Sequence, residues 1–460
     1  MRKVLKYPNY KESDVEWLGS IPEHWKIVKA KRILREVSIK NHPDEPLLAA
    51  TQTKGVIPKS LYENTTVTAS KNFETLKLVR KGDFVISLRS FQGGIEYAHY
   101  QGIISPAYTI LEPQEEVIHN YYRYLLKSKR YISGLTLLVT GIREGQNIDT
   151  SKFKDSFLPL PPKEEQTAIA RFLDYKLAKI NRFIQKKKQL IKLLNEQKAA
   201  IINQAVTKGL DPNAKMKDSG IEWLGEIPEH WEVRKFKHFT KILSGYSPEQ
   251  VEFNEKEGID YFKVEQLNNV NNEFRLNESS WKVKIQSTMN CYEKGLLLIP
   301  KRGAAISTNK VAISVNICLF DTNVMGLRLD EEIVDIDFIS LWLKNRNLIE
   351  IADTTTIPQI NNKHIYPLQI AIPQIAEQKM IVDYLKMESN KIALTISKIE
   401  KELALTEEYK TALIAEAVTG KIDVRSYEVP EIMEEETYEE IEEEISMAAE
   451  DAAEFETVEE

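Results

Sequence analysis

The sequence has little cysteine and no long apolar run. Only two of its 460 residues are cysteine, Cys291 and Cys318, and both fall in the second half of the chain. Two unclustered thiols build neither a disulfide framework nor a zinc site, and they are typical of a reducing compartment. No apolar run approaches the roughly 20 residues of a membrane-spanning helix. Met1-Arg2-Lys3 does not lead into the apolar region of a signal peptide. We therefore expect a cytoplasmic protein without membrane contact.

Motifs of catalysis and cofactor binding are missing as well. The sequence has neither a G-x-x-x-x-G-K-[ST] phosphate loop nor a G-x-G-x-x-G turn. The single Pro-Pro pair, Pro161-Pro162, is followed by Lys163 and so does not form the [DNS]-P-P-[FYW] motif of amino-methyltransferases. The nearest approach to a metal-ligand pair, Glu96 with His99, has no further ligand nearby in the sequence. We expect no catalytic residue, no metal and no cofactor in this chain.

Basic residues are absent from the C-terminal end. Residues 426–460 hold 16 Asp and Glu and no Lys or Arg. Residues 1–425 contain all 62 basic side chains and 53 of the 69 acidic ones, so they carry a net charge of +9 although the whole chain carries −7. A basic body suits a polyanionic partner. The tail is typical of a solvated, disordered acidic appendage.

The sequence does contain one long segment twice. Its landmarks are an aromatic turn and two later motifs: Trp17-Leu18-Gly19-Ser20-Ile21-Pro22-Glu23-His24-Trp25 returns as Trp223 to Trp231, Glu165-Gln166 as Glu377-Gln378, and Ala205-Val206-Thr207 as Ala417-Val418-Thr419. A period of about 210 residues indicates duplicated domains and not a solenoid. Because His24 and His230 occupy matching turns, we interpret both as structural residues.

Each copy ends in a stretch that contains neither glycine nor proline, at residues 163–208 and 374–419. Steps of four and three residues give the same mostly apolar seam in both stretches: Ile180, Ile184, Lys187, Ile191, Leu194, Lys198, Ile201 and Ala205, then Ile392, Ile396, Ile399, Leu403, Thr406, Lys410, Leu413 and Ala417. This heptad spacing predicts coiled-coil helices. Residues 163–208 carry a net charge of +7 and residues 375–420 a net charge of −2, which favours pairing of the two helices with each other.

The rest of each copy has short apolar runs between turn residues, as mixed strand-and-helix domains have. We predict an α/β mixed (α+β) fold in which two duplicated globular domains, 13–160 and 211–372, are joined by two long antiparallel coiled-coil helices, 161–210 and 373–425. The duplication implies pseudo-two-fold symmetry. An acidic tail, 426–460, follows the second helix.

Two polar turns at matching places are candidates for reading nucleic acid. The first follows an apolar strand and includes Arg89, Ser90, Gln92 and Gly93; the second also follows an apolar strand and includes Lys301, Arg302, Ser307 and Asn309. Arg and Gln can address guanine and adenine edges with two hydrogen bonds. Either turn could equally be a phosphate clamp or an ordinary surface turn.

These motifs resemble the specificity (S) subunits of type I restriction–modification systems. The resemblance rests on W-L-G-x-I-P-x-H-W before each half, on the turn Gly102 to Tyr108 after the first basic loop, and on P-x-x-x-E-Q at Pro161 and Pro373, and it covers residues 13 to about 425. Two departures are the stretch Asn316 to Thr322, which replaces the first half's Ser105-Pro106-Ala107-Tyr108 turn, and the acidic tail.

The resemblance implies a non-catalytic subunit with one target-recognition domain in each half. Each domain would bind one half of an asymmetric, bipartite site in double-stranded DNA. The long helices would set the spacing and dock two methyltransferase (M) subunits and the restriction (R) subunits. S-adenosylmethionine, ATP and Mg²⁺ would then belong to these partners and not to this chain. An alternative from another functional class is a duplicated coiled-coil scaffold that binds only proteins.

Overall fold

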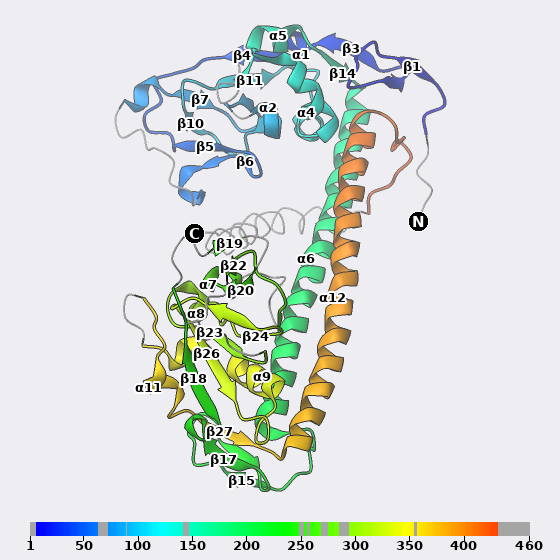
Figure 1. Ribbon diagram of the computed structural model, residues 1–460. Coiled ribbons are helices and arrows are strands. Elements are labelled where there is room, and N and C mark those ends of the chain that lie inside the picture. The colour runs from blue at the N-terminus through cyan, green and yellow to red at the C-terminus, as the bar shows by residue number, and fades with distance from the viewer. Residues whose placement is uncertain are drawn as a thin grey trace. The chain divides into compact units, whose positions relative to one another are not determined.

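The chain divides into two compact units. The computed structural model describes residues 6–62, 72–88, 90–140, 147–247, 253–254, 258–267, 275–284, 294–353 and 357–430. Unit 1 comprises residues 1–188 with 400–460, and unit 2 comprises residues 189–399. Each unit therefore contains one globular domain and a part of each long helix (Figure 1), whereas we predicted the helices as segments separate from the domains.

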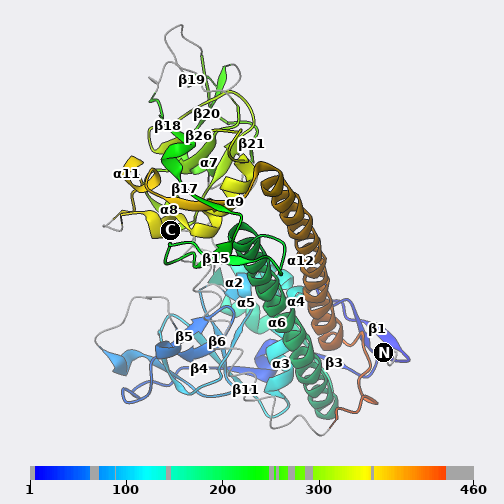
Figure 2. The ribbon, with the colours of Figure 1, turned by 90° about the horizontal axis from the view of Figure 1, so that it is seen from below.

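Two helices far exceed the others in length. Helix α6 spans Lys163–Lys208 and helix α12 spans Ile375–Val418. In unit 1 the first turns of α6 share a core with the last turns of α12, as Leu173 and Ala417 illustrate. In unit 2 the last turns of α6 share a core with the first turns of α12, as Val206 and Ile381 illustrate. The helices thus pack antiparallel within each unit, and two views show them side by side (Figures 1 and 2).

The predicted heptad seam is confirmed by burial. All sixteen predicted seam positions are buried or half-buried, while most residues between them are exposed. Lys187, a polar seam residue, pairs with Glu402 at 2.9 Å, so the seam tolerates this charge because the facing helix neutralises it. The absence of glycine and proline allows both helices to run without a break.

Unit 1 contains a four-stranded sheet with the order β4-β11-β8-β9. Strand β11 (Thr109–Pro113) lies between β4 (Leu34–Val37) and β8 (Phe84–Ile86), and β8 also pairs with β9 (Glu96–Tyr97), all antiparallel. The other elements of this unit are β1 (Tyr10–Glu12), β2 (Ser20–Pro22), β3 (Lys26–Lys29), α1 (Ala30–Ile33), β5 (Leu48–Thr51), β6 (Gly55–Pro58), η1 (Lys59–Leu61), η2 (Phe73–Thr75), β7 (Lys77–Val79), α2 (Ser90–Gly93), β10 (Gly102–Ile104), α3 (His119–Leu125), α4 (Lys129–Leu135), η3 (Thr136–Leu138), β12 (Val139–Thr140), β13 (Asn147–Ile148), α5 (Thr150–Asp155) and β14 (Phe157–Leu160).

Unit 2 contains a five-stranded sheet with the order β18-β26-β23-β24-β21. Strand β26 (Val324–Leu329) lies between β18 (Thr240–Ser244) and β23 (Leu297–Pro300), as β11 lies between β4 and β8 in unit 1. The other elements are β15 (Met216–Asp218), β16 (Glu226–Pro228), β17 (Glu232–Lys235), η5 (Phe236–His238), β19 (Phe253–Asn254), β20 (Ile259–Phe262), α7 (Val264–Leu267), β21 (Arg275–Leu276), β22 (Lys282–Val283), α8 (Ala304–Ser307), β24 (Ala312–Ser314), β25 (Cys318–Phe320), α9 (Ile336–Arg346), α10 (Leu348–Ile351), α11 (Asn362–Ile365) and β27 (Gln369–Ile372).

The repeated aromatic turns anchor the long helices through a glutamate. In unit 1 the buried Glu165 carboxylate accepts hydrogen bonds from Trp25 Nε1 at 2.8 Å and from the Tyr7 hydroxyl at 3.0 Å, and it contacts His24 Nε2 at 2.5 Å. In unit 2 Glu377 contacts Trp231 Nε1 at 3.0 Å and His230 Nε2 at 2.8 Å. Both glutamates lie in the first turn of their helix, where the helix dipole favours a negative charge. The two histidines are therefore parts of these anchors.

The glutamine after each glutamate joins the helix to the globular domain. Gln166 Oε1 accepts a hydrogen bond from Ile118 N at 2.8 Å, and Gln166 Nε2 donates to Pro161 O at 2.9 Å. Gln378 repeats this with Asp335 N at 2.8 Å and Pro373 O at 2.9 Å. Both glutamines are fully buried. Each E-Q pair of the repeated motif thus satisfies buried backbone groups that would otherwise be costly to leave unpaired.

The far ends of the helices close on the same turns. Gly420, at φ +72°, follows α12, and a Cβ there would lie 2.4 Å from Pro22 Cδ. Tyr121 donates a hydrogen bond to Val418 O at 2.7 Å in the same region. In unit 2 Gly209, at φ +75°, follows α6 beside the Trp231 ring. Each aromatic turn therefore holds the start of one long helix and the end of the other.

Candidate nucleic-acid interface

The first candidate turn leaves the carboxyl end of β8, an inner strand of the unit 1 sheet. Helix α2 begins at Ser90, which is fully buried and whose Oγ accepts a hydrogen bond from Ser87 N at 2.8 Å. Gln92 is exposed, and Gly93 lies so close to Gln52 that a Cβ would approach Gln52 Cγ at 2.9 Å. Arg89 lies outside the described residues. Ser90 and Gly93 therefore shape the turn, and of the predicted residues that the structure describes here, Gln92 is the one exposed to a ligand.

Lys127 holds this turn in place, which sequence reasoning missed. Its Nζ donates to Gly93 O and Gln52 O, both at 2.8 Å, and pairs with Glu96 Oε2 at 2.7 Å. Burial raises the pKa of the Glu96 carboxyl to about 7, although Lys127 opposes the shift. No local signal in the sequence could have identified Lys127, because its partners lie 34 and 75 residues away along the chain.

Of Glu96 and His99, the nearest approach to a ligand pair in the sequence, Glu96 is buried and His99 is half-buried. Burial, with smaller contributions from Arg123 and Lys81, lowers the pKa of His99 to about 4. The His99 ring packs edge-on against Tyr97, with ring centroids 4.9 Å apart. Within the described residues no group of three or more His, Cys, Asp or Glu is arranged to hold a metal ion.

The second candidate turn leaves β23 at the equivalent place in unit 2. Arg302 is exposed, and its backbone forms an isolated antiparallel bridge with Gln359. Lys301 is half-buried and its backbone N–H donates to Asn323 O at 2.7 Å. Gly303 has φ +88°, a conformation that L side chains rarely adopt. The glycine thus lets the chain turn sharply from the strand into α8.

Helix α8 presents one predicted residue, and the turn after it directs another inward. Ser307 is exposed, whereas Asn309 is half-buried with φ +53°. Asn309 Nδ2 donates to Lys344 O at 2.6 Å, and Asn309 Oδ1 accepts from Leu348 N at 2.9 Å. Asn309 therefore ties the turn to α9 and α10, while Arg302 and Ser307 remain accessible.

The stretch Asn316 to Thr322, a departure from the first half in sequence, contains a strand. Residues Cys318–Phe320 form β25, which pairs in parallel with β20. The chain reverses after it, where Asp321 Oδ1 accepts a hydrogen bond from Asn323 N at 2.6 Å. Burial raises the pKa of the Cys318 thiol to about 11, so this thiol stays protonated. Cys291 lies outside the described residues.

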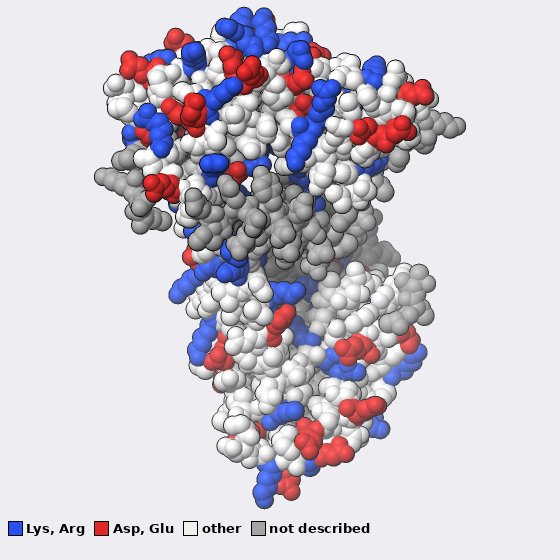
Figure 3. Space-filling view, turned by 180° about the vertical axis from the view of Figure 1, so that it is seen from behind, with Lys and Arg blue, Asp and Glu red and all other residues white. Residues whose placement is uncertain are grey.

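Charge does not gather into a single patch on the face seen in Figure 3, where Lys and Arg are interspersed with Asp and Glu. Some cations of unit 2 are paired, for example Arg275 with Asp337 at 2.7 Å and Lys282 with Asp260 at 2.9 Å. The Arg275–Asp337 pair is exposed, and exposed pairs contribute little to stability. The positions of individual cations at the two turns are therefore more informative than the net charge.

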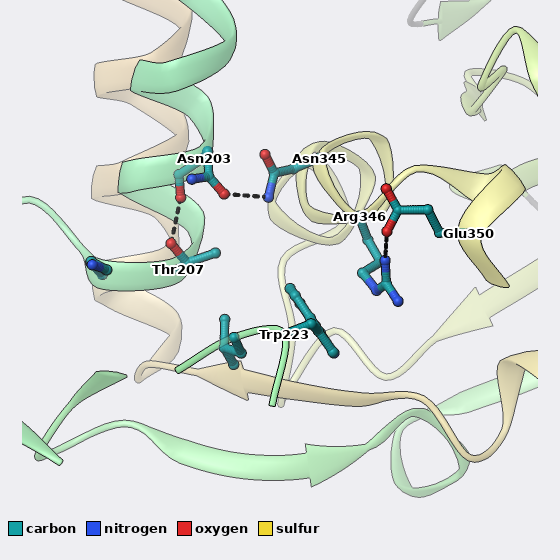
Figure 4. Close-up of a pocket in the computed structure, with 8 residues that line it drawn as sticks. Asn203, Thr207, Trp223, Asn345, Arg346 and Glu350 are labelled. Carbon is teal, nitrogen blue, oxygen red and sulfur yellow. Dashed lines mark hydrogen bonds and ion pairs between the residues drawn. The ribbon is translucent and has the colours of Figure 1, made fainter. Parts of the chain in front are cut away.

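A polar pocket of about 230 Å³ lies in unit 2 beside the repeated aromatic turn (Figure 4). Asn345 Nδ2 donates to Asn203 Oδ1 at 2.9 Å across it. The Arg346 guanidinium lies 4.6 Å from the Trp223 ring centroid and pairs with Glu350. The polar groups of the pocket thus contact one another and connect the end of α6 to the globular domain.

No helix of the described residues is long and apolar enough to cross a membrane.

Known proteins resemble both copies. A family model described as the type I restriction modification DNA specificity domain matches residues 18–193 and 228–405. The MjaVIII specificity subunit, from a type I restriction enzyme of Methanocaldococcus jannaschii, is 24% identical over 91% of this chain and 98% of its own length.

Two solved structures share the fold. One belongs to a structure described as the basis of complex assembly and conformational transition of the type I R-M system. Its chain gives a TM-score of 0.64 at 16% identity, and the match covers 87% of this chain and 99% of that one. The HsdS subunit from Thermoanaerobacter tengcongensis gives a TM-score of 0.52 at 15% identity, covering 87% and 98%. The predicted fold, duplicated mixed α/β domains joined by long helices, is thereby confirmed.

Proposed function

Because the chain belongs to the type I restriction–modification DNA specificity family, we propose that each of its domains reads one half of an asymmetric, bipartite site in double-stranded DNA. The observation that carries the proposal is the repeated turn: β8 leads into α2 and β23 leads into α8 at equivalent sheet positions, with different exposed side chains. Gln92 is presented in one domain and Arg302 in the other. Different side chains on equivalent scaffolds favour two different half-sites.

The proposal includes partner subunits in the cytoplasm. Two methyltransferase (M) subunits and restriction (R) subunits would dock on this chain, and they would supply S-adenosylmethionine, ATP and Mg²⁺. The exposed apolar side chains of the long helices, such as Leu193 and Leu405, support docking of proteins there because such groups gain from burial. A methylome of the host with and without this chain tests the proposal directly: a bipartite adenine-N6 motif should disappear when the chain is removed.

Substitutions in the two turns should affect different half-sites. We expect Arg89→Ala and Gln92→Ala to relax or abolish recognition of one half-site and Arg302→Ala to affect only the other. Each loss should be about 1–3 kcal/mol if the side chain makes a bidentate base contact. Binding of the assembled complex to duplexes altered in one half-site at a time measures this effect.

Lys237→Ala is the matched control for Arg302→Ala, because Lys237 is an exposed cation of the same unit outside the turn. Its loss should weaken binding little and equally for all sequences. A uniform loss with Arg302→Ala, accompanied by a shallower salt dependence, would instead identify Arg302 as a phosphate contact.

The purified chain alone should neither methylate nor cut DNA. Labelled S-adenosylmethionine and plasmid DNA, incubated with this polypeptide free of partners, should yield no labelled or cleaved DNA above the buffer control. Methyl transfer by the isolated chain would contradict the assignment as a specificity subunit. Assembly with partners but no salt-dependent, sequence-specific DNA binding would instead favour the protein-only scaffold.

A further inference from the structure

The acidic C-terminal segment begins on a basic stretch of α6 within unit 1. After α12 the chain packs Ile422 and Val424 into the unit 1 core. Tyr427 then lies against α6, with its ring centroid 4.8 Å from that of Phe172 and 5.3 Å from Lys176 Nζ. The segment that follows therefore leaves the described part of the chain beside the first half of this helix.

The face of α6 beyond this contact is cationic and partly apolar. Lys179, Arg182 and Lys186 are exposed and follow one another at steps of three and four residues, so they lie on one face of the helix. Phe183, 37% exposed, lies beside them. The seam that packs against α12 uses other positions, such as Ile180 and Ile184. We call Lys179, Arg182, Phe183 and Lys186 the basic face of α6.

The sequence after Tyr427 complements this face in charge and pattern. Residues 428–460 contain 16 acidic and no basic side chains. Apolar residues recur at steps of three and four: Tyr438, Ile441, Ile445, Ala448, Ala452 and Phe455. The apolar side chains are thus interspersed among acidic ones, and they would gain from contact with an apolar side chain of a partner surface.

We propose that residues 428–460 dock on the basic face of α6 as an intramolecular ligand that polyanions must displace. The distance is within reach: from Phe172 to Lys186 the helix rises about 21 Å, whereas 33 residues span about 50 Å as a helix. The exposed Glu400, Glu407 and Glu408 of α12 would repel the same segment. Tethering gives the segment an effective concentration of about 1 mM at this face, which favours it over free polyanions.

Lysine acetylation in the full-length chain and in a variant that ends at Pro430 tests the proposal. A low dose of an amine-reactive acetyl ester is followed by mass spectrometry of each lysine. Lys179 and Lys186 should react about threefold faster in the shortened variant at low salt, and the difference should vanish near 0.5 M salt, where screening is strong. Lys188 is the internal control, because it is exposed but two residues from Lys186 and so faces elsewhere.

A full-length variant with Glu434, Glu435, Glu436, Glu442, Glu443 and Glu444 replaced by Gln should behave like the shortened one. Carbodiimide cross-linking of mixed isotope-labelled and unlabelled chains should join Lys179 or Lys186 to the tail within one chain. Equal acetylation in all variants, or a change that includes Lys188, would overturn the proposal. Cross-links found only between chains would overturn it in favour of docking on a second copy.

Discussion

Inserting four residues into each long helix is expected to lengthen the unspecified gap of the DNA target by one or two base pairs while both half-sites stay unchanged. Four residues are close to one full turn and add about 6 Å along a helix. Because B-DNA rises about 3.4 Å per base pair, 6 Å corresponds to about two base pairs. The original target should no longer be methylated, so this is among the largest effects that the proposed function predicts.

The structure dictates that the insertions be paired. Lys187 contacts Glu402 across the antiparallel helices, and the same register continued along both helices brings Asn195 level with Leu394. Both of these residues are exposed. Four residues inserted near Asn195 alone would shift α6 against α12 by one turn. Matching insertions at both places preserve the seam, because after nearly one full turn the seam residues that follow each insertion still face the other helix.

Modification-sensitive sequencing of hosts that carry each variant measures the outcome. The variant with the single insertion near Asn195 serves as the comparison. If α6 slides along α12, its complex should also shift the gap, and if α6 stays in place, its complex should methylate DNA weakly. An altered half-site with an unchanged gap in the paired variant would contradict the role of the helices as spacers.

The long helices and their pairing could be predicted from the sequence because local patterns determine them. The absence of glycine and proline and the seams that begin at Ile180 and Ile392 act over short separations. The opposite charge balance of the two stretches could be read from composition, although the helices that it pairs lie about 210 residues apart. The E-Q motif could likewise be recognised as repeated. Only the structure shows that the glutamate of this motif accepts a hydrogen bond from Trp25 in one copy and from Trp231 in the other. Glu165 lies 140 residues from Trp25 along the chain.

The candidate turns show which part of the site the sequence could not resolve. The sequence located the strand ends, but it did not separate side chains that build the turn from those that face solvent. Ser90 and Asn309 hydrogen-bond to the backbone of their own domain. Such bonds are common for short polar side chains at turns. Their residue types are also those that contact DNA, so composition alone could not distinguish the two uses.

Glu165→Ala is expected to be strongly destabilising, by about 3 kcal/mol or more, because it leaves two buried donors, Trp25 Nε1 and the Tyr7 hydroxyl, without their acceptor. For a unit of this size the melting temperature should fall by about 6–12 °C. Glu377→Ala should cost less, since the Glu377 side chain is 30% exposed against 8% for Glu165 and no tyrosine donates to it among its described contacts.

Calorimetry and denaturant titration of the full chain measure both losses. Glu164→Ala is the matched control, because Glu164 is exposed and lies in the same first turn of α6. Its negative charge interacts with the helix dipole as that of Glu165 does. If Glu165→Ala lost no more stability than Glu164→Ala, the glutamate would act only through the helix dipole. A larger loss of stability with Glu165→Ala would instead show that the repeated aromatic turn fixes the long helix to its domain. The proposed role of the helices as spacers requires this rigid connection.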